Sequence, residues 1–220
     1  MSKSKREEKE QSILDSAEQM FSLMGYENTK MENIADNIGI SKGLVYFYFN
    51  SKENLYMALT FQAMRTMNDM FYNVLRDNQG KNGLDSTMVL AEAYIDFLER
   101  HPFYLELLNN YTSLVRSSNQ KNNQLSDAMK NSIYFRKIKD IHNIPITIFQ
   151  EEIARGQKDG SIHNKRSPNL LYMTLWSLVV GFNQLKSAAA QNNRMTMYQI
   201  DIREWKNYIV ELIRKTFYDE

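Results

Sequence analysis

The sequence predicts an all-α protein with about nine helices. Only three prolines and eight glycines occur in 220 residues, so helix breakers are few. Apolar residues recur at three- and four-residue steps along most of the chain, which is the period of one face of an amphipathic helix. Capping residues, glycines and prolines divide this pattern into three short helices followed by a larger helical bundle.

The composition excludes several kinds of site. The chain has no cysteine, so it has no disulfides, thiolate zinc sites or cysteine nucleophiles, which fits a reducing cytosol. The formal net charge is +1, and residues 1–60 hold seven Lys and Arg against nine Asp and Glu, so bulk charge indicates no nucleic-acid partner. Because the polar N-terminus is unlike a signal peptide and no apolar run could span a bilayer, we expect a cytoplasmic protein without a membrane partner. Residues 3–10 mix basic and acidic side chains, which favours a solvated, frayed tail over an auxiliary DNA-contacting arm.

Glycines delimit the first two helices. An amphipathic pattern over 13–24 ends at a glycine. Thr29 and Glu32 match the T-x-x-E capping box, in which the hydroxyl accepts a backbone N–H, and they predict a short helix over 30–38. Gly39 ends this helix, because glycine adopts the left-handed conformation at little cost.

The aromatic run VYFYF at 45–49 favours a strand by residue propensity alone. Its flanks favour a helix instead. Ser41 can cap a helix that starts at Lys42, Asn50 and Ser51 break it, and Ser51 can cap the next helix. Because two capping signals lie about ten residues apart and no partner strand is near, we predict a short helix here.

The helices over 30–38 and 42–49, joined by the turn 39–41, make a helix-turn-helix. In that motif the second helix enters the major groove of DNA with its N-terminal residues leading. Val45 and Phe49 lie four residues apart, so they share one face and can pack on the preceding helix. The opposite face of the second helix is then free to contact DNA.

Loops and caps predict the remaining helices. Residues 117–124 fit either a polar loop or a weak extension of the helix before them. We expect helices over 51–77, from Asp85 or Ser86 to Arg100, from Pro102 to about 117, over 125–155 with an interruption at 143–145, from Pro168 to about 191, and from a capping box at Thr196 and Gln199 to about Tyr218.

The stretch ILDSAEQMFSLMGYENTKMENIADNIGISKGLVYFYFNSKENLY resembles the N-terminal domain of TetR-family transcriptional regulators. The resemblance covers about residues 11–57, which is a quarter of the chain, and the combination of its elements is specific. The matching elements are Gly25-Tyr26, Thr29, Ile34-Ala35, Gly39-Ile40-Ser41-Lys42-Gly43, Tyr46, Tyr48-Phe49 and Ser51-Lys52-Glu53-x-Leu55. Two positions depart from the common pattern: Leu44 replaces a small or polar residue, and Val45 replaces a leucine.

This resemblance implies a DNA-binding domain over 1–52 and a helical ligand-binding and dimerisation domain over 53–220. It implies a homodimer that reads a palindromic operator in double-stranded DNA. It also implies a small-molecule effector, and no cofactor or metal. The implied function is that of a repressor that a small apolar or amphipathic ligand releases from its operator. The implied DNA-contacting residues are Thr29, Lys30, Ser41, Lys42, Gly43, Leu44, Tyr46, Phe47, Tyr48 and Lys52.

Apolar stripes in the second domain supply candidate residues for the other two implied roles. Such stripes are usually core, and a purely intrachain core is the alternative reading for both sets. The candidate ligand-binding residues are Tyr94, Phe97, Phe103, Tyr104, Leu107, Tyr111, Phe149, Met173 and Trp176. The candidate dimer-interface residues are Leu175, Val179, Phe182, Trp205, Ile209, Leu212 and Ile213.

Other functions receive less support from the sequence. A regulator that activates, or that lacks an inducer, fits the same motifs. A helical ligand-binding or scaffold protein with a lapsed DNA-binding domain is the alternative from another class. An enzyme is not expected, because no zinc-protease, nucleophile-elbow or P-loop motif occurs. His101, His142 and His163 lie far apart in the sequence, which favours solvated or capping roles over a metal site.

Overall fold

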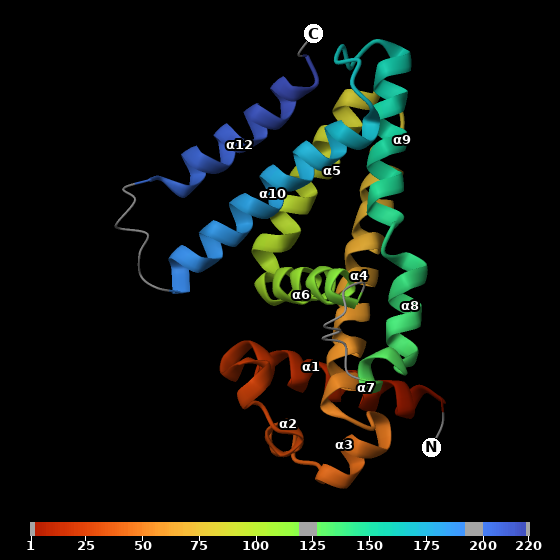
Figure 1. Ribbon diagram of the computed structural model, residues 1–220, viewed down its shortest axis with the longest axis vertical. Helices are drawn as coiled ribbons and strands as arrows, with labels where there is room; N and C mark the ends of the chain where they lie inside the picture. Colours follow the sequence, from red (N-terminus) through yellow and green to blue (C-terminus); the bar gives the residue numbers. More distant parts are fainter. Residues whose placement is uncertain (1–2, 119–126, 192–199, 219–220) are drawn as a thin grey trace. The chain divides into compact units, whose positions relative to one another are not determined.

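The computed structural model describes residues 3–118, 127–191 and 200–218 (Figure 1). Within these ranges every regular element is a helix, which confirms the predicted all-α class. The chain divides into two compact units. The first unit holds residues 1–64 and 106–141, and the second holds 65–105 and 142–220. No helix in the described part of the chain is both long and apolar enough to cross a membrane.

The first unit contains the helix-turn-helix. Three helices precede the long fourth one, and a short pair follows later in the sequence. Their bounds are α1 Lys3–Asn28, α2 Met31–Asn37, α3 Lys42–Tyr48, the first half of α4 Lys52–Asp77, most of α6 Pro102–Ser118, α7 Asp127–Lys130 and α8 Ile133–Ile141. Phe21, Ile34, Val45 and Phe49 are each at most 1% exposed, so α1, α2 and α3 close over one apolar core.

The expectation of a frayed tail over 3–10 is wrong, because α1 begins at Lys3. Side-chain hydrogen bonds tie this part of α1 to other elements of the same unit. The Glu10 carboxylate accepts a hydrogen bond from the hydroxyl of Tyr134, and Gln11 donates one to Gln62. The predicted break at Gly25 is confirmed, since its φ of 77° and ψ of 160° are not helical.

The predicted capping box at Thr29 and Glu32 is wrong by one position. The N-cap of α2 is Lys30, whose backbone N–H donates to the side-chain oxygen of Asn33 at 2.8 Å. Thr29 is fully buried, and its hydroxyl donates to the backbone carbonyls of Met20 and Gly25. Thr29 therefore fastens the end of α1 and does not cap α2.

The aromatic run is a helix, as its flanks predict. Ser41 caps α3, with its side chain accepting the N–H of Leu44 at 3.2 Å. Gly39 precedes it with a φ of 63°, in the left-handed region that glycine adopts readily. Ser51 accepts the N–H of Asn54 at 3.1 Å at the start of α4. The helix-turn-helix boundaries thus follow from local hydrogen bonds.

The second unit is built from long helices. In Figure 1 α10 and α12 run side by side, and α5 packs against α9, α10 and α12. These helices are the second half of α4, α5 Gly83–Arg100, α9 Ile144–Asp159, α10 Pro168–Gln191 and α12 Ile202–Thr216.

Three boundaries differ from the sequence predictions. The N-cap of α5 is Asn82, which accepts the N–H of Asp85 at 2.8 Å, so neither Asp85 nor Ser86 is the cap. The predicted helix over 125–155 is three helices, and Pro145 in the first turn of α9 marks the expected interruption. α12 starts after Asp201, whose side chain accepts two backbone N–H groups.

The other boundaries in this part follow the predictions or cannot be compared. Ser167 accepts the N–H of Leu170 ahead of α10, as predicted. The proposed capping box at Thr196 and Gln199 lies outside the described residues, as does most of the polar stretch 117–124.

Candidate nucleic-acid interface

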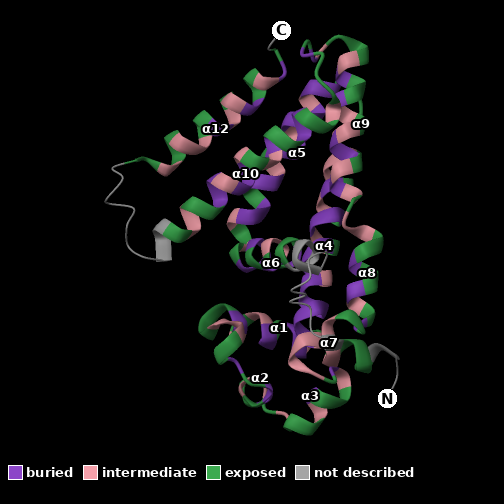
Figure 2. Ribbon diagram, in the orientation of Figure 1, coloured by how far each residue is buried: buried purple, intermediate pink, exposed green. Residues whose placement is uncertain are grey.

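Helix α3 has one buried face and one exposed face (Figure 2). Val45 and the C-cap residue Phe49 are completely buried, and they anchor the helix in the core of the first unit. On the other side Phe47 is 72% exposed and Tyr46 is 43% exposed. The ring of Tyr48 meets that of Phe47 edge to face, with centroids 5.5 Å apart. An exposed aromatic face on a helix whose back is firmly packed is available to a partner.

Charged groups at this end of the first unit come from α3 and from the cap of α2. The ammonium group of Lys42 lies 3.3 Å from a carboxylate oxygen of Glu32, and both side chains are about half exposed. Lys30 is exposed at the N-cap of α2. An exposed ion pair is worth at most about 1 kcal/mol, so Lys42 can exchange Glu32 for another anion at little cost.

Gly43 lies in the first turn of α3 with open space around its α-carbon. A β-carbon built there would meet one atom within 4 Å, the Ser41 hydroxyl oxygen at 4.0 Å, which is an ordinary contact. Glycine inside a helix costs about 0.5–1 kcal/mol relative to alanine. No packing within the chain requires this glycine, so its missing side chain leaves room for something outside the protein.

Lys52 has a different role from the predicted phosphate contact. Its ammonium group donates to the backbone carbonyls of Tyr26, Glu27 and Thr29 at 2.8, 3.3 and 3.2 Å. It also lies 4.3 Å from the centre of the Tyr26 ring. A lysine ammonium has three N–H donors, and three carbonyls occupy them. Lys52 therefore fastens the start of α4 to the end of α1.

The ten predicted DNA-contacting residues thus fall into two groups. Thr29 is buried and Lys52 is engaged within the chain, so neither presents a free group to solvent. The other eight lie on the surface of α2 and α3 or half exposed beside it: Lys30, Ser41, Lys42, Gly43, Leu44, Tyr46, Phe47 and Tyr48.

Sequence reasoning missed the residues that support this face from behind. Tyr134 on α8 donates a hydrogen bond of 3.0 Å to Glu10 on α1, and its ring lies 6.3 Å from that of Phe49. Burial, followed by the charge of Glu10, raises the pKa of Tyr134 above its ordinary value. Tyr56 on α4 accepts a hydrogen bond of 2.8 Å from Asn110 on α6, and burial raises its pKa to about 12. Partners more than 50 residues apart leave no local pattern in the sequence.

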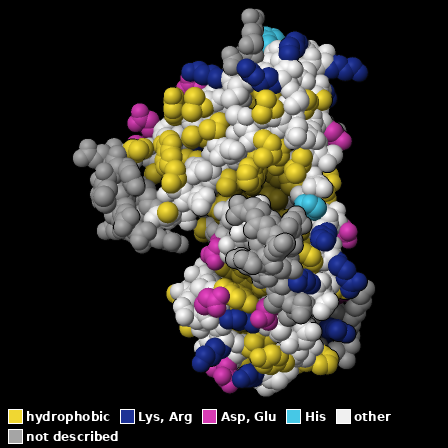
Figure 3. Space-filling model, viewed as in Figure 1, with side chains coloured by type: hydrophobic (Ala, Val, Ile, Leu, Met, Phe, Trp, Pro, Cys, Tyr) yellow, Lys and Arg dark blue, Asp and Glu magenta, His cyan; other side chains and the backbone are white. Residues whose placement is uncertain are grey.

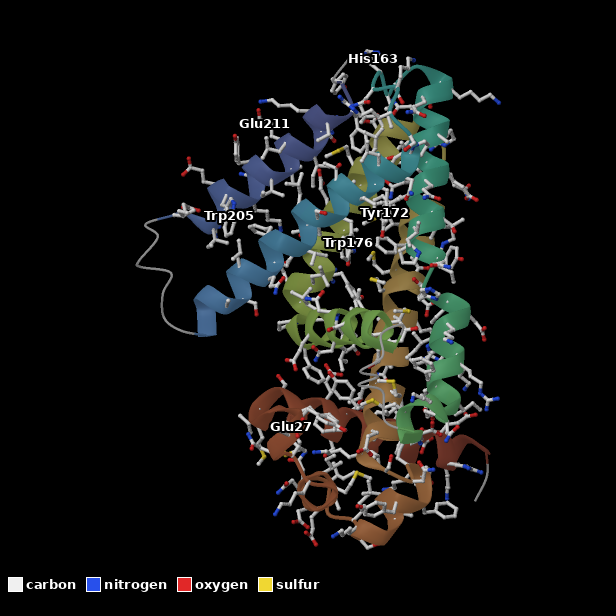
Figure 4. All side chains as sticks on the ribbon, in the orientation of Figure 1. Glu27, His163, Tyr172, Trp176, Trp205 and Glu211 are labelled. Carbon is white, nitrogen blue, oxygen red and sulfur yellow. The ribbon has the colours of Figure 1, made fainter. Side chains whose placement is uncertain are left out.

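The candidate ligand-binding residues do not form one cluster. Tyr94 and Phe149 belong to an aromatic group in the second unit, in which Phe71 contacts both at centroid distances of 5.6 and 5.4 Å. Trp176 donates a hydrogen bond to the Tyr94 hydroxyl, and burial raises the pKa of Tyr94 to about 12. Tyr172 packs 5.6 Å from Phe149, and Figure 4 shows Tyr172 and Trp176 together on α10. This group combines apolar rings with buried polar hydrogens.

The remaining candidates lie elsewhere. Phe97 and Tyr104 surround His101, whose ring centre is 4.9 and 5.0 Å from theirs, and burial lowers the pKa of this histidine. Phe103 is buried in the second unit. Leu107 and Tyr111 are buried in the first unit. Met173 is 44% exposed, so it is on the surface of α10 and outside the aromatic group.

Most candidate dimer residues are buried within the chain itself. Leu175, Val179, Phe182, Ile209 and Ile213 are at most 8% exposed, so the intrachain-core alternative describes these five. Trp205 is half-buried, packing edge-on against Phe182 at 4.9 Å, and Leu212 is half-buried too. Figure 3 shows groups of apolar side chains on the surface of the molecule. The large exposed apolar residues of α10 and α12 are Leu170, Met173, Leu185 and Tyr208.

The described residues offer no cluster of three or more His, Asp or Glu placed to hold a metal ion.

Comparison with known proteins agrees with the geometry of the first unit. Residues 13–59 match the model of the family "Bacterial regulatory proteins, tetR family". IcaR of Staphylococcus aureus, a negative transcriptional regulator of the biofilm operon icaADBC, is 31% identical over 101 residues. That alignment covers 44% of this chain and 52% of IcaR, so the chain matches about half the length of this relative.

Two solved structures share the fold of the whole chain. A tetR-family regulatory protein from Rhodococcus RHA1 has a TM-score of 0.70 at 19% identity, over 96% of this chain and 97% of its own. FadR of Bacillus subtilis, solved in complex with stearoyl-CoA, has a TM-score of 0.63 at 16% identity, over 94% and 98% of the two chains. The match at residues 13–59, on a chain whose fold is that of these solved regulators, places this protein in the tetR family of bacterial regulatory proteins.

Proposed function

We propose that this protein is a homodimeric transcriptional repressor that binds operator DNA through α3 and leaves it when a small apolar or amphipathic ligand binds. The observation that carries the proposal is the exposed face of α3. Val45 and Phe49 hold the helix from behind, while Tyr46 and Phe47 face solvent. This is the orientation that a recognition helix needs to enter a major groove. A repressor of this kind acts in the cytoplasm, where the chromosomal DNA is.

Gly43 supports DNA contact at the start of α3. Nothing inside the chain fills the space beside its α-carbon. In a helix-turn-helix the first residues of the second helix approach the DNA most closely. A glycine there permits that approach, which explains why the chain carries a residue that weakens its own helix.

Phosphate contacts in this proposal come from Lys30, Lys42 and Tyr48. Contacts of this kind position the protein on the duplex without reading its sequence. Lys30 is exposed, and Lys42 is held only by its surface pair with Glu32. Because few cations lie near α3, we expect non-specific binding to be weak and to fade quickly as salt is raised.

Dimerisation in this proposal uses the exposed side of α10 with support from α12. Leu170, Met173 and Leu185 are between 44% and 61% exposed on α10. Gly181, on the same helix, has no atom within 4 Å of the place where a β-carbon would be. Apolar side chains flanking an open glycine fit close packing by the same helix of a second copy. Two copies would place their recognition helices about one turn of DNA apart, roughly 34–36 Å.

The effector site in this proposal is the aromatic group around Tyr94 and Trp176. It offers apolar ring faces together with a buried hydroxyl and an indole N–H, which is the usual composition of a small-molecule site. The stearoyl-CoA complex of FadR shows that a protein of this fold binds a long apolar ligand.

Release from DNA requires a ligand that binds the DNA-incompetent arrangement more tightly than the competent one. Helix α4 is a natural lever, because its residues belong to both compact units. Lys52 fixes the first turn of α4 to the end of α1 through Tyr26, Glu27 and Thr29. A shift of α4 would therefore displace α1 and, with it, the packing of the helix-turn-helix.

The test of the DNA-binding proposal is a fluorescence-anisotropy titration at several salt concentrations. The probe is the intergenic duplex beside the protein's own gene, and the control is the same duplex with its sequence shuffled. We expect tighter binding to the native duplex, with an affinity that falls steeply as salt is raised. If neither that duplex nor any duplex recovered by selection from a random library binds better than shuffled DNA, the proposal is wrong.

The effector proposal can be tested with tryptophan fluorescence. The chain has two tryptophans, so a Trp205→Phe variant leaves Trp176 as the single reporter. Stearoyl-CoA and shorter acyl-CoAs serve as first probes. A saturable change in Trp176 emission, together with loss of operator binding, is the expected result. A probe that binds there and leaves operator affinity unchanged would contradict the release mechanism.

A further inference from the structure

The exposed face of α3 has few groups that can read a base by hydrogen bonding. The helix sequence is KGLVYFY, so it contains no Arg, Asn or Gln, the residues that usually pair with guanine or adenine edges. Its single lysine, Lys42, already contacts Glu32. Among the outward side chains Tyr46 offers one hydroxyl, while Leu44 and Phe47 offer only apolar surface.

An apolar side chain can read one feature of the major groove, the C5-methyl group of thymine, because the other groups on the base edges are hydrogen-bond donors and acceptors. We propose that Leu44 and Phe47 read thymine methyl groups, so that the preferred half-site carries thymines where these two side chains meet the groove. This inference rests on the proposed function and specifies its DNA partner.

The geometry of α3 suits this role. Leu44 and Phe47 are three residues apart in a helix, which places them on neighbouring parts of one surface. The edge-to-face contact with Tyr48, at 5.5 Å and 84°, restricts the ring of Phe47 before any DNA is present. A side chain that is already ordered loses less entropy on binding. Gly43, one residue before Leu44, lets the backbone come close enough for short side chains to reach the bases.

The charges around α3 favour the same conclusion. Glu32 and Asp36 are exposed on α2, and residues 1–60 carry more acidic than basic groups. Figure 3 shows apolar side chains between basic ones at the end of the molecule formed by α2 and α3. With weak general attraction to phosphates, discrimination between sequences depends mainly on what the helix surface itself contacts.

The experiment begins with selection of the best-bound duplex from a random library by the wild-type protein. That duplex is then made with deoxyuridine in place of each thymine in turn, which removes one methyl group and keeps the base pairing. At the thymines facing Leu44 and Phe47 we expect affinity to fall about fourfold per methyl group, the effect of burying one such group. The salt dependence of binding should stay the same, because no phosphate contact is altered.

Two variants make the test specific. Phe47→Ala changes a side chain that is 72% exposed, so the fold should persist, and this variant should lose its discrimination between thymine and deoxyuridine at one position. Tyr72→Ala is the control, because it removes an aromatic side chain that is 51% exposed on α4. This control should discriminate as the wild type does.

The outcomes separate this inference from the proposed function. If a duplex is selected and bound specifically but thymine and deoxyuridine bind equally at every position, the methyl readout is wrong and the DNA-binding function stands. The same holds if Phe47→Ala keeps full discrimination and Leu44→Ala does too. If no duplex is enriched over shuffled DNA, the proposed function itself fails.

Discussion

The ammonium group of Lys52 donates a 2.8 Å hydrogen bond to the backbone carbonyl of Tyr26 and lies 4.3 Å from the centre of the ring of the same residue. It thus closes the end of α1 beyond the kink at Gly25, where the carbonyls have no further helical turn to accept from. The tyrosine ring continues this contact inward, because it packs 4.8 Å from Tyr56 on α4. The lysine therefore links the two helices that carry the helix-turn-helix.

This contact predicts that Lys52→Met destabilises the protein and leaves the salt dependence of DNA binding unchanged. The free energy of unfolding should fall by about 1–3 kcal/mol, since a charged donor to three carbonyls is lost. Lys30→Ala is the matched comparison, because Lys30 is exposed at the cap of α2. That variant should keep its stability and reduce the salt slope by about one per protomer. Thermal unfolding and anisotropy at several salt concentrations measure both effects. A Lys52→Met protein of normal stability with a reduced slope would identify Lys52 as a phosphate contact instead.

Gly43→Ala is expected to change stability and DNA affinity in opposite directions. Alanine at this position meets no closer neighbour than the Ser41 hydroxyl oxygen at 4.0 Å, so it should stabilise the protein by about 0.5–1 kcal/mol through its better helix propensity. The same methyl group would stand between α3 and the DNA and weaken operator binding. Chemical denaturation and anisotropy test the two halves. Unchanged operator affinity would show that the DNA does not approach Gly43.

Leu185→Glu is expected to break the proposed dimer. Leu185 is 61% exposed on α10, so a charge there should be tolerated in the monomer and penalised in a packed interface. The dimer dissociation constant should rise at least about tenfold, which corresponds to about 1.4 kcal/mol. Sedimentation velocity over a range of concentrations measures it. Leu23→Glu is the control, because Leu23 is 76% exposed on α1 and should leave the assembly unchanged. Equal behaviour of the two variants would remove α10 from the interface.

Tyr134→Phe tests the support that α8 gives to the DNA-binding helices. The ring remains beside Phe49, but the hydrogen bond to Glu10 is lost, which should cost about 0.5–1.5 kcal/mol of unfolding free energy. If α8 holds α1 in the DNA-competent position, operator affinity should fall as well. Tyr72→Phe, at an exposed site on α4, is the control for loss of a tyrosine hydroxyl. Wild-type operator affinity in Tyr134→Phe would confine this hydrogen bond to stability.

The ion-pair group around Glu99 predicts a specific loss of stability in acid. Partial burial opposes ionisation of Glu99, but hydrogen bonds from Lys186 and Lys206 outweigh it and hold the pKa of Glu99 below its ordinary value. A carboxyl whose pKa is lowered by folding contributes stability above its unfolded pKa of about 4.3, and this contribution disappears as the pH falls through its folded pKa. Melting temperatures between pH 3 and 7 should therefore fall less steeply for Glu99→Gln than for the wild type. Parallel curves would mean that Glu99 contributes nothing to acid sensitivity.

The sequence by itself determined the elements whose signals are local. Ser41 caps α3 by accepting an N–H three residues away, Gly39 turns the chain just before it, and the spacing of Val45 and Phe49 decides which face of α3 is buried. Groups within four residues of one another carry these interactions, so they can be read from the chain. For the same reason the aromatic run was correctly predicted as a helix against its strand propensity.

Tertiary structure alone decided the roles that depend on partners distant in the sequence. Lys52 looked like a free cation until the carbonyls of α1, more than 20 residues earlier, were placed around it. Helix α10 is apolar on most sides, so the sequence could not tell that Leu175 faces its own core while Leu185 faces outward. Burial and hydrogen bonding are properties of what surrounds a side chain in space, and those surroundings exist only once the helices have packed.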